Sequence, residues 1–524
     1  MNFSLYVTPV ESDVNNIEKY LCSQKNIIKK TTSKIRIYLS ATVDTLKIKE
    51  LKDGRLMMGE FKSKAAKEQT YDFIEAETYE QINDLFWAVI VDTSKDVVKV
   101  INDRFSSKEI YHFEDGDAVF VFTDFKILFS LYKGAAKINL SALKAYLIDG
   151  YIPAPYTIID GVSKLPYASC AIIGSKCFQI QRYFLYSELK NVHISNVWVD
   201  YIEAKTQFKN VVRKSFAQKK LSDRAIVLLS SGVDSTYLAT VAKEIYDGVD
   251  ALTIGQNVGD DRYDESKAAK KVAEMIGLEQ TIKMLDSDLI FDIVEQSLEI
   301  FPELFGDTAQ VTVYHMASNG DRFVDYICGE GADSIFYKSG NNGEKYNKKE
   351  QLVNKIFNIS FHNEKQTQGP FNEHLYEWEH VIQGLVHKTV AVFDYFDLNV
   401  SFPYLDNSLI RLCASLPELY IGNDVKKKRI LRDLLNEKIN YDKLCLPKRG
   451  AGVPIYKILK EKHKDELIYL LGEKVIARQG IFNVEIITEM LDCFFDDRRL
   501  CDVKVSGMIW RLYLFQKWYE RYMN

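Results

Sequence analysis

The chain of 524 residues is long enough for two or more domains, and its hydrophobic fraction of 47% can supply a buried core in each. Its formal net charge of -5, with basic residues mostly dispersed, argues against a protein that binds nucleic acid through phosphate contacts. No uninterrupted apolar run reaches membrane-spanning length, and the sequence opens without a basic leader, so we expect a globular, cytoplasmic protein. The eight cysteines contain no Cys-x-x-Cys pair and suggest neither a zinc site nor a disulfide framework.

Strand-like runs of apolar and β-branched residues occur at 33–48, 85–103 and 117–129, and they predict a β-rich first domain. Residues 141–148 have helical spacing and are followed by a proline-marked turn. We place the boundary near 190–205, which gives domains of residues 1–195 and 200–524. Beyond that boundary the pattern becomes α/β and then strongly helical.

The most informative stretch is a buried strand at 225–229, a short turn, and a helical pattern at 236–244. The turn contains small and polar residues: Ser230, Ser231, Gly232, Asp234 and Ser235. Backbone amides and a helix N-terminus at such a turn favour a bound phosphate, and the Asp234 carboxylate would repel that phosphate unless a divalent cation bridges them. The turn therefore predicts a polyphosphate with Mg²⁺, although similar turns also occur for packing alone.

Two further segments continue this α/β pattern. Residues 251–255 form a second apolar strand, and a helix is expected to open at 263–266 and run to Leu278. Residues 325–333 lead from a strand into a Gly-x-Gly turn that ends in the Asp333 carboxylate. Such a turn would bring a second Mg²⁺ ligand to the carboxyl edge of the sheet.

These motifs carry a family resemblance. The turn Ser-Ser-Gly-Val-Asp-Ser resembles the Ser-Gly-Gly-x-Asp-Ser pyrophosphate loop of ATP pyrophosphatases, with Ser231 in place of a glycine. Gly329-Glu330-Gly331-Ala332-Asp333 is similar to a segment of asparagine synthetase-type amidotransferases. Further landmarks of that family follow in order at 102–111, 123–128, 150–153, 161–166, 402–406, 428–432, 446–454 and 473–518. The resemblance covers about residues 85–524.

The resemblance implies an Ntn-hydrolase-like αββα sandwich first, then a doubly wound parallel-sheet ATP-pyrophosphatase domain with extra helices. It implies ATP and Mg²⁺ as cofactors, with Mg²⁺ held by Asp234 and Asp333. ATP and pyrophosphate would contact Leu229, Ser230, Ser231, Gly232, Asp234, Ser235, Ile254, Gly329 and Lys428. Glu330 and Lys448 would be catalytic, as proton acceptor and oxyanion stabiliser. The alternatives are a plain core position for Ile254, an ordinary loop position for Glu330, and solvated surface positions for Lys428 and Lys448.

The sequence departs from the family pattern in the first domain. Asn2 stands where the family has its catalytic cysteine, and Met58-Gly59-Glu60 replaces the Asn-Gly-Glu segment that supplies an oxyanion donor. Because an asparagine side chain is no thiolate nucleophile, we expect a domain that kept its fold and lost glutamine hydrolysis. β-Lactam synthetases and lasso-peptide macrocyclases are family offshoots with such a silenced first domain.

The second departure lies at 390–401, where the family's charged substrate-side segment has become largely apolar and aromatic. A pocket that binds aspartate needs fixed charges opposite to those of the substrate, and this segment has lost most of its charges, so aspartate fits poorly as the substrate. We therefore predict an AMP- and pyrophosphate-forming amide ligase that makes a specialised metabolite or a modified peptide. Its substrates would be a carboxylate and an amine donor, without nucleic acid or membrane; a biosynthetic partner protein and a homodimer are the candidate assemblies. The alternatives are an ammonia-dependent asparagine synthetase, an amidotransferase fed by a separate glutaminase, and a non-catalytic nucleotide-binding scaffold.

Overall fold

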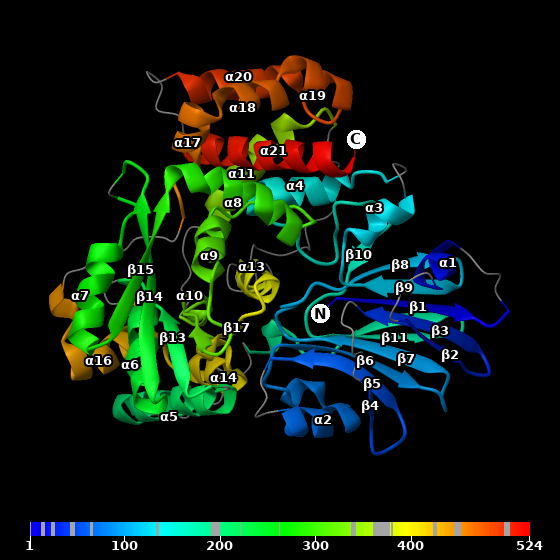
Figure 1. Cartoon of the computed structure of the whole chain (residues 1–524), viewed down its shortest axis with the longest axis horizontal. Helices are drawn as coiled ribbons and strands as arrows, with labels where there is room; N and C mark the ends of the chain where they lie inside the picture. Colours follow the sequence, from blue (N-terminus) through cyan, green and yellow to red (C-terminus); the bar gives the residue numbers. More distant parts are fainter. Residues whose placement is uncertain are drawn as a thin grey trace.

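The computed structural model of the protein describes most of the chain. The described residues are 2–11, 16–22, 27–41, 48–62, 67–132, 136–189, 200–220, 222–260, 262–336, 342–359, 378, 381–422, 427–444, 452–496 and 503–523. Figure 1 shows an all-antiparallel part in blue and cyan beside a parallel-sheet part in green, with orange and red helices above. Antiparallel sheets in the first part and a parallel sheet in the second agree with the expected β-rich and α/β character, while residues 190–199 of the predicted boundary lie outside the described residues and the domain limits stay a prediction.

Two six-stranded antiparallel sheets form the first part. The order of the first sheet is β10 (Ser163–Lys164), β8 (Tyr111–Asp115), β9 (Ala118–Phe122), β1 (Phe3–Pro9), β3 (Ile35–Ala41) and β2 (Ile27–Thr31). The order of the second is β12 (Cys177–Arg182), β11 (Ser169–Gly174), β7 (Val97–Asn102), β6 (Phe86–Asp92), β5 (Leu56–Phe61) and β4 (Lys49–Glu50).

Alternation along the strands builds the layers of this part. In β9, Val119 and Val121 join the core between the two sheets, while Phe120 and Phe122 point into the core on the other face. That outer face is covered by α1 (Asn16–Cys22), α3 (Ile127–Tyr132) and α4 (Leu140–Asp149). The second sheet packs against α2 (Lys67–Glu75) and η1 (Tyr79–Gln81). The layers are helix, sheet, sheet and helix, and the relation to Ntn hydrolases stays a prediction.

The expected strand run at 117–129 is wrong in its second half. The strand β9 ends at Phe122, and α3 begins at Ile127. The reason is local, because the Asp124 carboxylate accepts the Lys126 N–H at 3.1 Å and turns the chain toward a helix. The helix expected at 141–148 is confirmed as α4, which is capped by Asn139 and ends at Gly150 with φ of 86°.

The second part contains a five-stranded parallel sheet. Its order is β15 (Glu279–Asp286), β14 (Gly248–Asn257), β13 (Arg224–Leu228), β16 (Asp325–Ile327) and β17 (Asn399–Ser401). The order reverses beside β13, so the chain winds outward in both directions from the β13–β16 pair. The carboxyl ends of β13 and β16 therefore meet at the switch point, where α/β sheets bind their ligands.

Helices surround this sheet and form the layer above it (Figure 1). The sheet is flanked by α5 (Tyr201–Lys219), α6 (Val233–Ile245), α7 (Ser266–Ile276), α8 (Ser287–Ile300), α9 (Ala309–Ala317), α10 (Ala332–Ile335), α13 (Ile382–Tyr395), η4 (Pro403–Leu405), α14 (Asn407–Ser415), α15 (Glu418–Ile421), α16 (Arg429–Ile439) and η5 (Tyr441–Leu444). The upper layer contains α11 (Asn342–Ile356), α17 (Ile455–Lys462), α18 (Lys464–Leu470), α19 (Glu473–Gln479), α20 (Val484–Phe495) and α21 (Val503–Tyr522). Within the described ranges, every helix is too short or too polar to cross a bilayer.

The helix α21 joins the two parts of the molecule. Arg511 donates to the carbonyls of Leu147 and Ile148, at 2.6 and 2.8 Å, and the Tyr146 hydroxyl donates to the Arg511 carbonyl at 3.2 Å. These bonds attach the last described helix to the carboxyl end of α4. The Trp510 indole donates to the Gly306 carbonyl at 2.9 Å and fixes the same helix to the second part.

A buried charge network also crosses between the parts. Lys164 forms ion pairs with Glu109, at 2.7 Å, and with Glu303 of the second part. His387 approaches Glu109 with 3.6 Å between Nε2 and Oε2. Burial raises the pKa of Glu303 to about 7, because the attraction of Lys164 does not offset it. Two carboxylates thus share one lysine inside the interface.

Candidate functional site

The turn between β13 and α6 lies at the switch point of the parallel sheet. Ser235 accepts the Ser230 N–H at 3.0 Å, and the Ser230 hydroxyl accepts the Gly232 N–H at 3.1 Å. The two hydroxyls lie 2.8 Å apart, so the serines brace the turn from within. Ser231 is buried, and its φ is not positive, so a serine replaces the family's glycine without strain.

The two predicted metal ligands lie together. Lys428 Nζ is 2.5 Å from Asp234 Oδ2 and 2.6 Å from Asp333 Oδ1, so a single ammonium bridges the two carboxylates. Asp234 is in the first turn of α6, and Asp333 is in the first turn of α10 after β16. The structure therefore brings three sequence-predicted residues from distant segments to one point.

Lys428 has an unusual backbone conformation. It precedes α16 with φ of 55° and ψ of 45°, which is the left-handed region that lysine seldom adopts. Burial alone would lower the pKa of Lys428, but the carboxylates of Asp234 and Asp333 outweigh it and raise that pKa. The ammonium therefore stays charged beside the helix that begins at Val233, where a leaving pyrophosphate would need a fixed cation.

These residues fit a magnesium ion held jointly with a phosphate. Carboxylate oxygens are the ligands that Mg²⁺ prefers, and this ion usually completes its shell with water and substrate phosphates. Within the described part of the chain, no group of three or more His, Cys, Asp or Glu side chains forms a self-contained metal site. Asp234 and Asp333 are the two carboxylates that could share such an ion with a bound phosphate.

Glu330 lies three residues before Asp333 in the same turn, and two side chains of helix α13 hold its carboxylate. Its Oε2 accepts the Thr389 hydroxyl at 2.7 Å, and its Oε1 lies 3.3 Å from the ammonium of Lys388. Lys388 is fully buried and also pairs with Asp307 at 2.9 Å. Burial alone would lower the pKa of Lys388, but Asp307 and Glu330 raise it. The carboxylate of Glu330 is therefore oriented by two neighbours.

The turn that carries Glu330 packs tightly on both sides. A Cβ atom on Gly329 would lie 3.4 Å from the Ser235 nitrogen, so this turn contacts the start of α6. Gly331 has φ of 93°, and a Cβ there would lie 2.4 Å from the Leu405 side chain. The close packing fixes Glu330 and Asp333 relative to the β13–α6 turn.

We expect Gly331→Ala to destabilise the protein by at least about 2 kcal/mol, because it adds overpacking to left-handed strain. Gly480→Ala is the matched control: Gly480 has φ of 68° and no atom within 4 Å of its added Cβ, so strain alone should cost about 1 kcal/mol. Denaturant melts of both variants measure the difference. Equal losses would show that the Leu405 contact has no effect.

The remaining predicted residues have different environments. Leu229 and Ile254 are buried in the apolar core. The backbone of Leu229 is also bonded within the sheet, since its N–H donates to the Leu252 carbonyl at 2.9 Å and its carbonyl accepts the Thr253 hydroxyl at 2.7 Å. The core environment of Ile254 is the one expected under its alternative, and its adenine role stays a prediction. Lys448 lies outside the described residues. Gly329 and Gly232 line the two adjoining turns.

Several contacts of the site were not predicted from sequence. Glu265 accepts both the N–H and the hydroxyl of Ser231, each at 3.3 Å. Tyr441 donates to the Ser231 carbonyl at 2.5 Å, and Tyr404 donates to the Asp234 carbonyl at 3.0 Å. Tyr404 follows the proline in the 402–406 landmark, a signal that could have indicated it. For Glu265, by contrast, the only sequence signal is its position directly before a helix.

The residues predicted to replace the family's glutaminase residues lie directly before β1 and within β5. Asn2 accepts a bond from Thr123 at 3.4 Å, and Thr123 also accepts the N–H of Phe3. Glu60 is engaged by Lys62 at 3.0 Å and by the Trp87 indole at 3.3 Å. Burial alone would raise the pKa of Glu60, but Lys62 and other cations lower it to about 2. Lys62 also pairs with Asp394 of α13, which links this corner to the second part.

Comparisons with known proteins agree with the two-part architecture. The family model Asparagine synthase matches residues 207–520, and the model Glutamine amidotransferase domain matches residues 49–184. Asparagine synthetase [glutamine-hydrolyzing] 1 of Bacillus subtilis is 22% identical over 51% of this chain and 41% of its own length. Putative asparagine synthetase [glutamine-hydrolyzing] 2 of Methanocaldococcus jannaschii is 22% identical over 51% of this chain and 52% of its own length. The match thus spans about half the length of these curated relatives.

Among solved structures, the NH3-dependent NAD synthetase of Campylobacter jejuni matches 27% of this chain and 62% of its own, with 16% identity and a TM-score of 0.20. That score is too low to support an argument. The first family model, in contrast, covers more than half of the chain and includes the β13–α6 turn, Glu330, Asp333 and Lys428. The chain belongs to the asparagine synthase family.

Proposed function

We propose that the protein is an ATP-dependent amide ligase that forms AMP and pyrophosphate while it adenylates a substrate carboxylate for attack by an amine. The observation that carries the proposal is the meeting of Asp234, Asp333 and Lys428 at the switch point of the parallel sheet. Two carboxylates and a fixed ammonium suit a metal-bound triphosphate that breaks between its α and β phosphates.

Each group has a role in this scheme. Asp234 and Asp333 would hold Mg²⁺, which neutralises charge on the triphosphate when bound. The Lys428 ammonium stabilises the negative charge that grows on the leaving pyrophosphate, an interaction that strengthens only as the bond breaks. Glu330, oriented by Thr389 and Lys388, accepts the proton that the amine loses when it attacks the acyl group. Lys448 is proposed as the oxyanion partner on family resemblance alone.

The nitrogen source is proposed to be an amine and not the side-chain amide of glutamine. Asn2 offers no thiol at the start of β1, and the Glu60 carboxylate is occupied by Lys62 and Trp87. The acyl substrate is proposed to differ from aspartate. Along 390–401, Val390, Val392 and Phe393 are buried in the core, and the Asp394 carboxylate pairs with Lys62. Specialised-metabolite or peptide modification is the reaction class that this supports.

The test is a mass-spectrometric assay of purified protein with ATP and Mg²⁺. Carboxylates labelled with ¹⁸O, as amino acids and short peptides, are offered in pools together with ammonium, glutamine or amines. We expect ¹⁸O to appear in AMP with one carboxylate pool, no glutamate release from glutamine, and no AMP from the Asp234→Asn variant. Label transfer demonstrates adenylation directly, because the carboxylate oxygen stays on AMP after the amine attacks.

Other outcomes identify the alternatives. Asparagine formed from aspartate and ammonium would establish an ammonia-dependent synthetase and refute the substrate argument. Glutamate released in step with product would refute the inactive first domain, whereas activity only with an added glutaminase would reveal a two-subunit amidotransferase. Binding of ATP without formation of AMP in the presence of any carboxylate pool would favour a non-catalytic nucleotide-binding scaffold.

A further inference from the structure

Helix α13 lies between the parallel-sheet part and the antiparallel part of the molecule, and Figure 1 shows it in yellow at this junction. Two of its side chains hold the carboxylate of Glu330. The Thr389 hydroxyl donates to Glu330 at 2.7 Å, and the Lys388 ammonium lies 3.3 Å from it. The place of the proposed proton acceptor therefore depends on the place of this helix.

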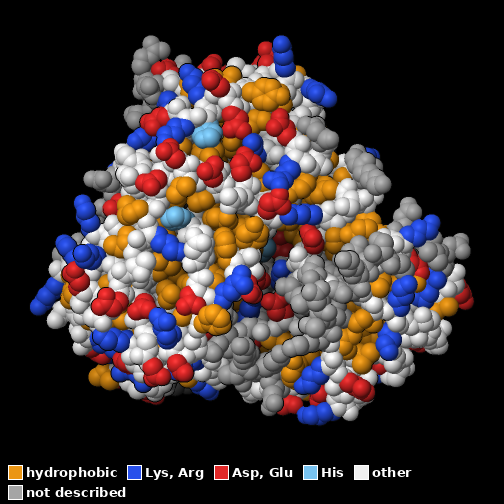
Figure 2. Space-filling view, in the orientation of Figure 1, with side chains coloured by type: hydrophobic (Ala, Val, Ile, Leu, Met, Phe, Trp, Pro, Cys, Tyr) orange, Lys and Arg blue, Asp and Glu red, His pale blue; other side chains and the backbone are white. Residues whose placement is uncertain are grey.

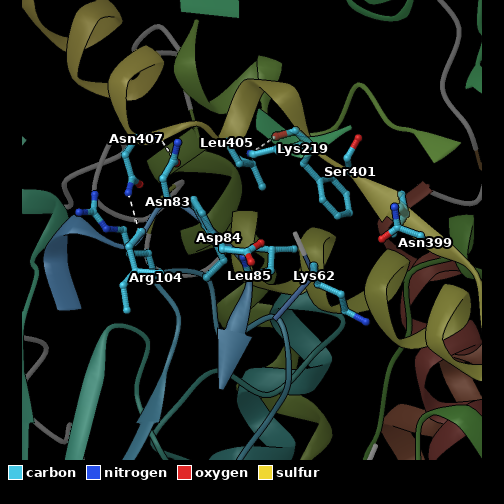
Figure 3. Close-up of a pocket in the computed structure, with 14 residues that line it drawn as sticks. Lys62, Asn83, Asp84, Leu85, Arg104, Lys219, Asn399, Ser401, Leu405 and Asn407 are labelled. Carbon is cyan, nitrogen blue, oxygen red and sulfur yellow. Dashed lines mark hydrogen bonds between the residues drawn. The ribbon is translucent and has the colours of Figure 1, made fainter. Parts of the chain in front are cut away.

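The main chain of the turn that carries Glu330 is fixed by a different segment. The Ser401 carbonyl accepts the Cys328 N–H at 2.9 Å, and a Cβ atom on Gly331 would lie 2.4 Å from the Leu405 side chain. Ser401 and Leu405 also line a small pocket at the contact with the first part (Figure 3). Movement of α13 would therefore change the orientation of the Glu330 side chain without unfolding its turn.

The first part contacts α13 on the side of the helix that faces away from Thr389. The ring of Tyr151 packs on Gly384, where a Cβ atom would lie 3.1 Å from it. One turn further on, Nε2 of His387 lies 3.6 Å from Oε2 of Glu109. Because positions three residues apart share one side of a helix, Gly384 and His387 form one stripe, and Thr389 lies opposite.

An ion pair holds the carboxyl end of α13. Lys62 directly follows β5 and pairs with Asp394 in the last turn of α13, and with Glu60 at 3.0 Å. Burial alone would lower the pKa of Lys62, but the carboxylates of Asp394 and Glu60 outweigh it and raise that pKa. Lys62 and Asp394 are only 21% and 14% exposed, so water screens their attraction weakly. The first part thus contacts the helix from Gly384 to Asp394, over about three turns.

This corner is where the first part departs from its family. Glu60 ends the Met58-Gly59-Glu60 segment that stands in place of the family's oxyanion donor, and the Trp87 indole donates to its carboxylate at 3.3 Å. The segment that would serve glutamine hydrolysis in the family therefore supports, in this chain, the lysine that holds α13.

We propose that the first part acts as a positioning domain for α13, and that Lys62, through Asp394, is a positioning residue for Glu330. The proposal rests on the proposed ligase function, in which Glu330 serves the attack of the amine. Adenylation depends instead on the β13–α6 turn and on Lys428. A shift of α13 should therefore impair amide formation more than AMP formation.

The test is hydrogen exchange of the full chain, followed by mass spectrometry, in the wild type and in Lys62→Met and Asp394→Asn. Peptides from 382–395 should exchange at least about fivefold faster in both variants, because the helix loses its ionic anchor, while peptides from α6 keep their rates. Lys62→Arg should restore most of the protection, because a guanidinium also pairs with a carboxylate. Asp394→Asn breaks the same pair from the other side, so the test stands even if Lys62→Met does not fold.

Lys99→Met is the matched control, because Lys99 is 19% exposed and pairs at 2.6 Å with Glu77 inside the first part; exchange of α13 should not change. In the labelled-carboxylate assay, Lys62→Met should lower the ratio of amide to AMP by about fivefold or more, and Lys62→Arg should recover it. General destabilisation would lower amide and AMP together and leave their ratio unchanged.

The proposal is overturned if α13 exchanges at the wild-type rate in the folded Lys62→Met and Asp394→Asn proteins, or if Lys99→Met accelerates it equally. Faster exchange of α13 with an unchanged ratio of amide to AMP would overturn the link to Glu330. A wild type that forms no AMP would refute the ligase function instead, and the exchange rates would still decide whether the first part holds α13.

Discussion

Lys428→Met is expected to reduce AMP formation by about 100- to 1000-fold, the typical cost of removing one donor from a preorganised charge-stabilising site. The reason is that the ammonium lies 2.5 Å from Asp234 and 2.6 Å from Asp333, where the pyrophosphate charge would develop. The measurement is the single-turnover rate of AMP release with the carboxylate that supports turnover. We expect the loss mainly in this rate rather than in ATP affinity, because the extra negative charge on the pyrophosphate develops only as the bond to the α phosphate breaks.

Lys427→Met is the matched control for that experiment. Lys427 is the adjacent residue and is exposed, so its removal should leave the rate near that of the wild type. A rate unchanged by Lys428→Met would assign that lysine a structural role. Mn²⁺ titration of the nucleotide-free variant adds a second readout, since the ammonium and a divalent cation compete for the same carboxylates and the variant should bind the metal more tightly.

Lys164→Met is expected to destabilise the fold by about 3–5 kcal/mol, because it leaves two carboxylates facing each other without their shared cation. The side chains of Lys164 and Glu303 are only 5% and 4% exposed, so water cannot replace the lost pairing. Equilibrium denaturation measures the loss. Lys126→Met is the control: it removes a pair with Glu299 across the same two parts, but at 38% and 40% exposure it should cost less than about 1 kcal/mol.

A compensating variant tests the cause. Glu303→Gln added to Lys164→Met should recover part of the loss, because it removes one of the two opposed charges. The pH dependence has a defined sign: the folded pKa of Glu303, about 7, lies above its ordinary value of 4.5, so its stabilising contribution is present below pH 4.5 and is lost as pH rises through 7. Glu303→Gln alone should therefore lose less stability than the wild type between pH 5 and pH 8. An equal decline in the stability of the wild type and of Glu303→Gln would refute the assignment of this pH dependence to Glu303.

The sequence predicted the site best where the relevant pattern is local. A strand, a turn of small residues and a helix occupy adjacent positions at 225–244, so the place of Asp234 follows from spacing alone. Its meeting with Asp333 follows from topology, because the carboxyl ends of neighbouring parallel strands share one edge. The 117–129 run failed for a related reason: apolar residues on both sides of Asp124 look alike in a strand or a buried helix, and one side-chain hydrogen bond decides.

Contacts between remote side chains were beyond such reasoning. Lys388 and Glu330 come from α13 and the β16 turn, and only the packing of that helix against the sheet decides which of its faces meets Glu330. The left-handed backbone of Lys428 and the Glu265 contact to Ser231 are set by tertiary structure as well. Nothing in hydrophobic periodicity marks these pairs, since each residue is locally an ordinary polar position.

The bond between Tyr146 and Arg511 has a consequence for biosynthesis. The two residues are 365 positions apart, so at about 5–20 residues per second the partner of α4 leaves the ribosome roughly 20–70 s later. During that interval the apolar surface of the first part that α21 covers, including the side chain of Phe129 against Trp518 and Tyr522, has no native cover. The ring of Phe129 therefore gains its native cover only when translation reaches the red C-terminal helix (Figure 1), and Figure 2 shows acidic and basic side chains interspersed with apolar ones on one face of the finished molecule.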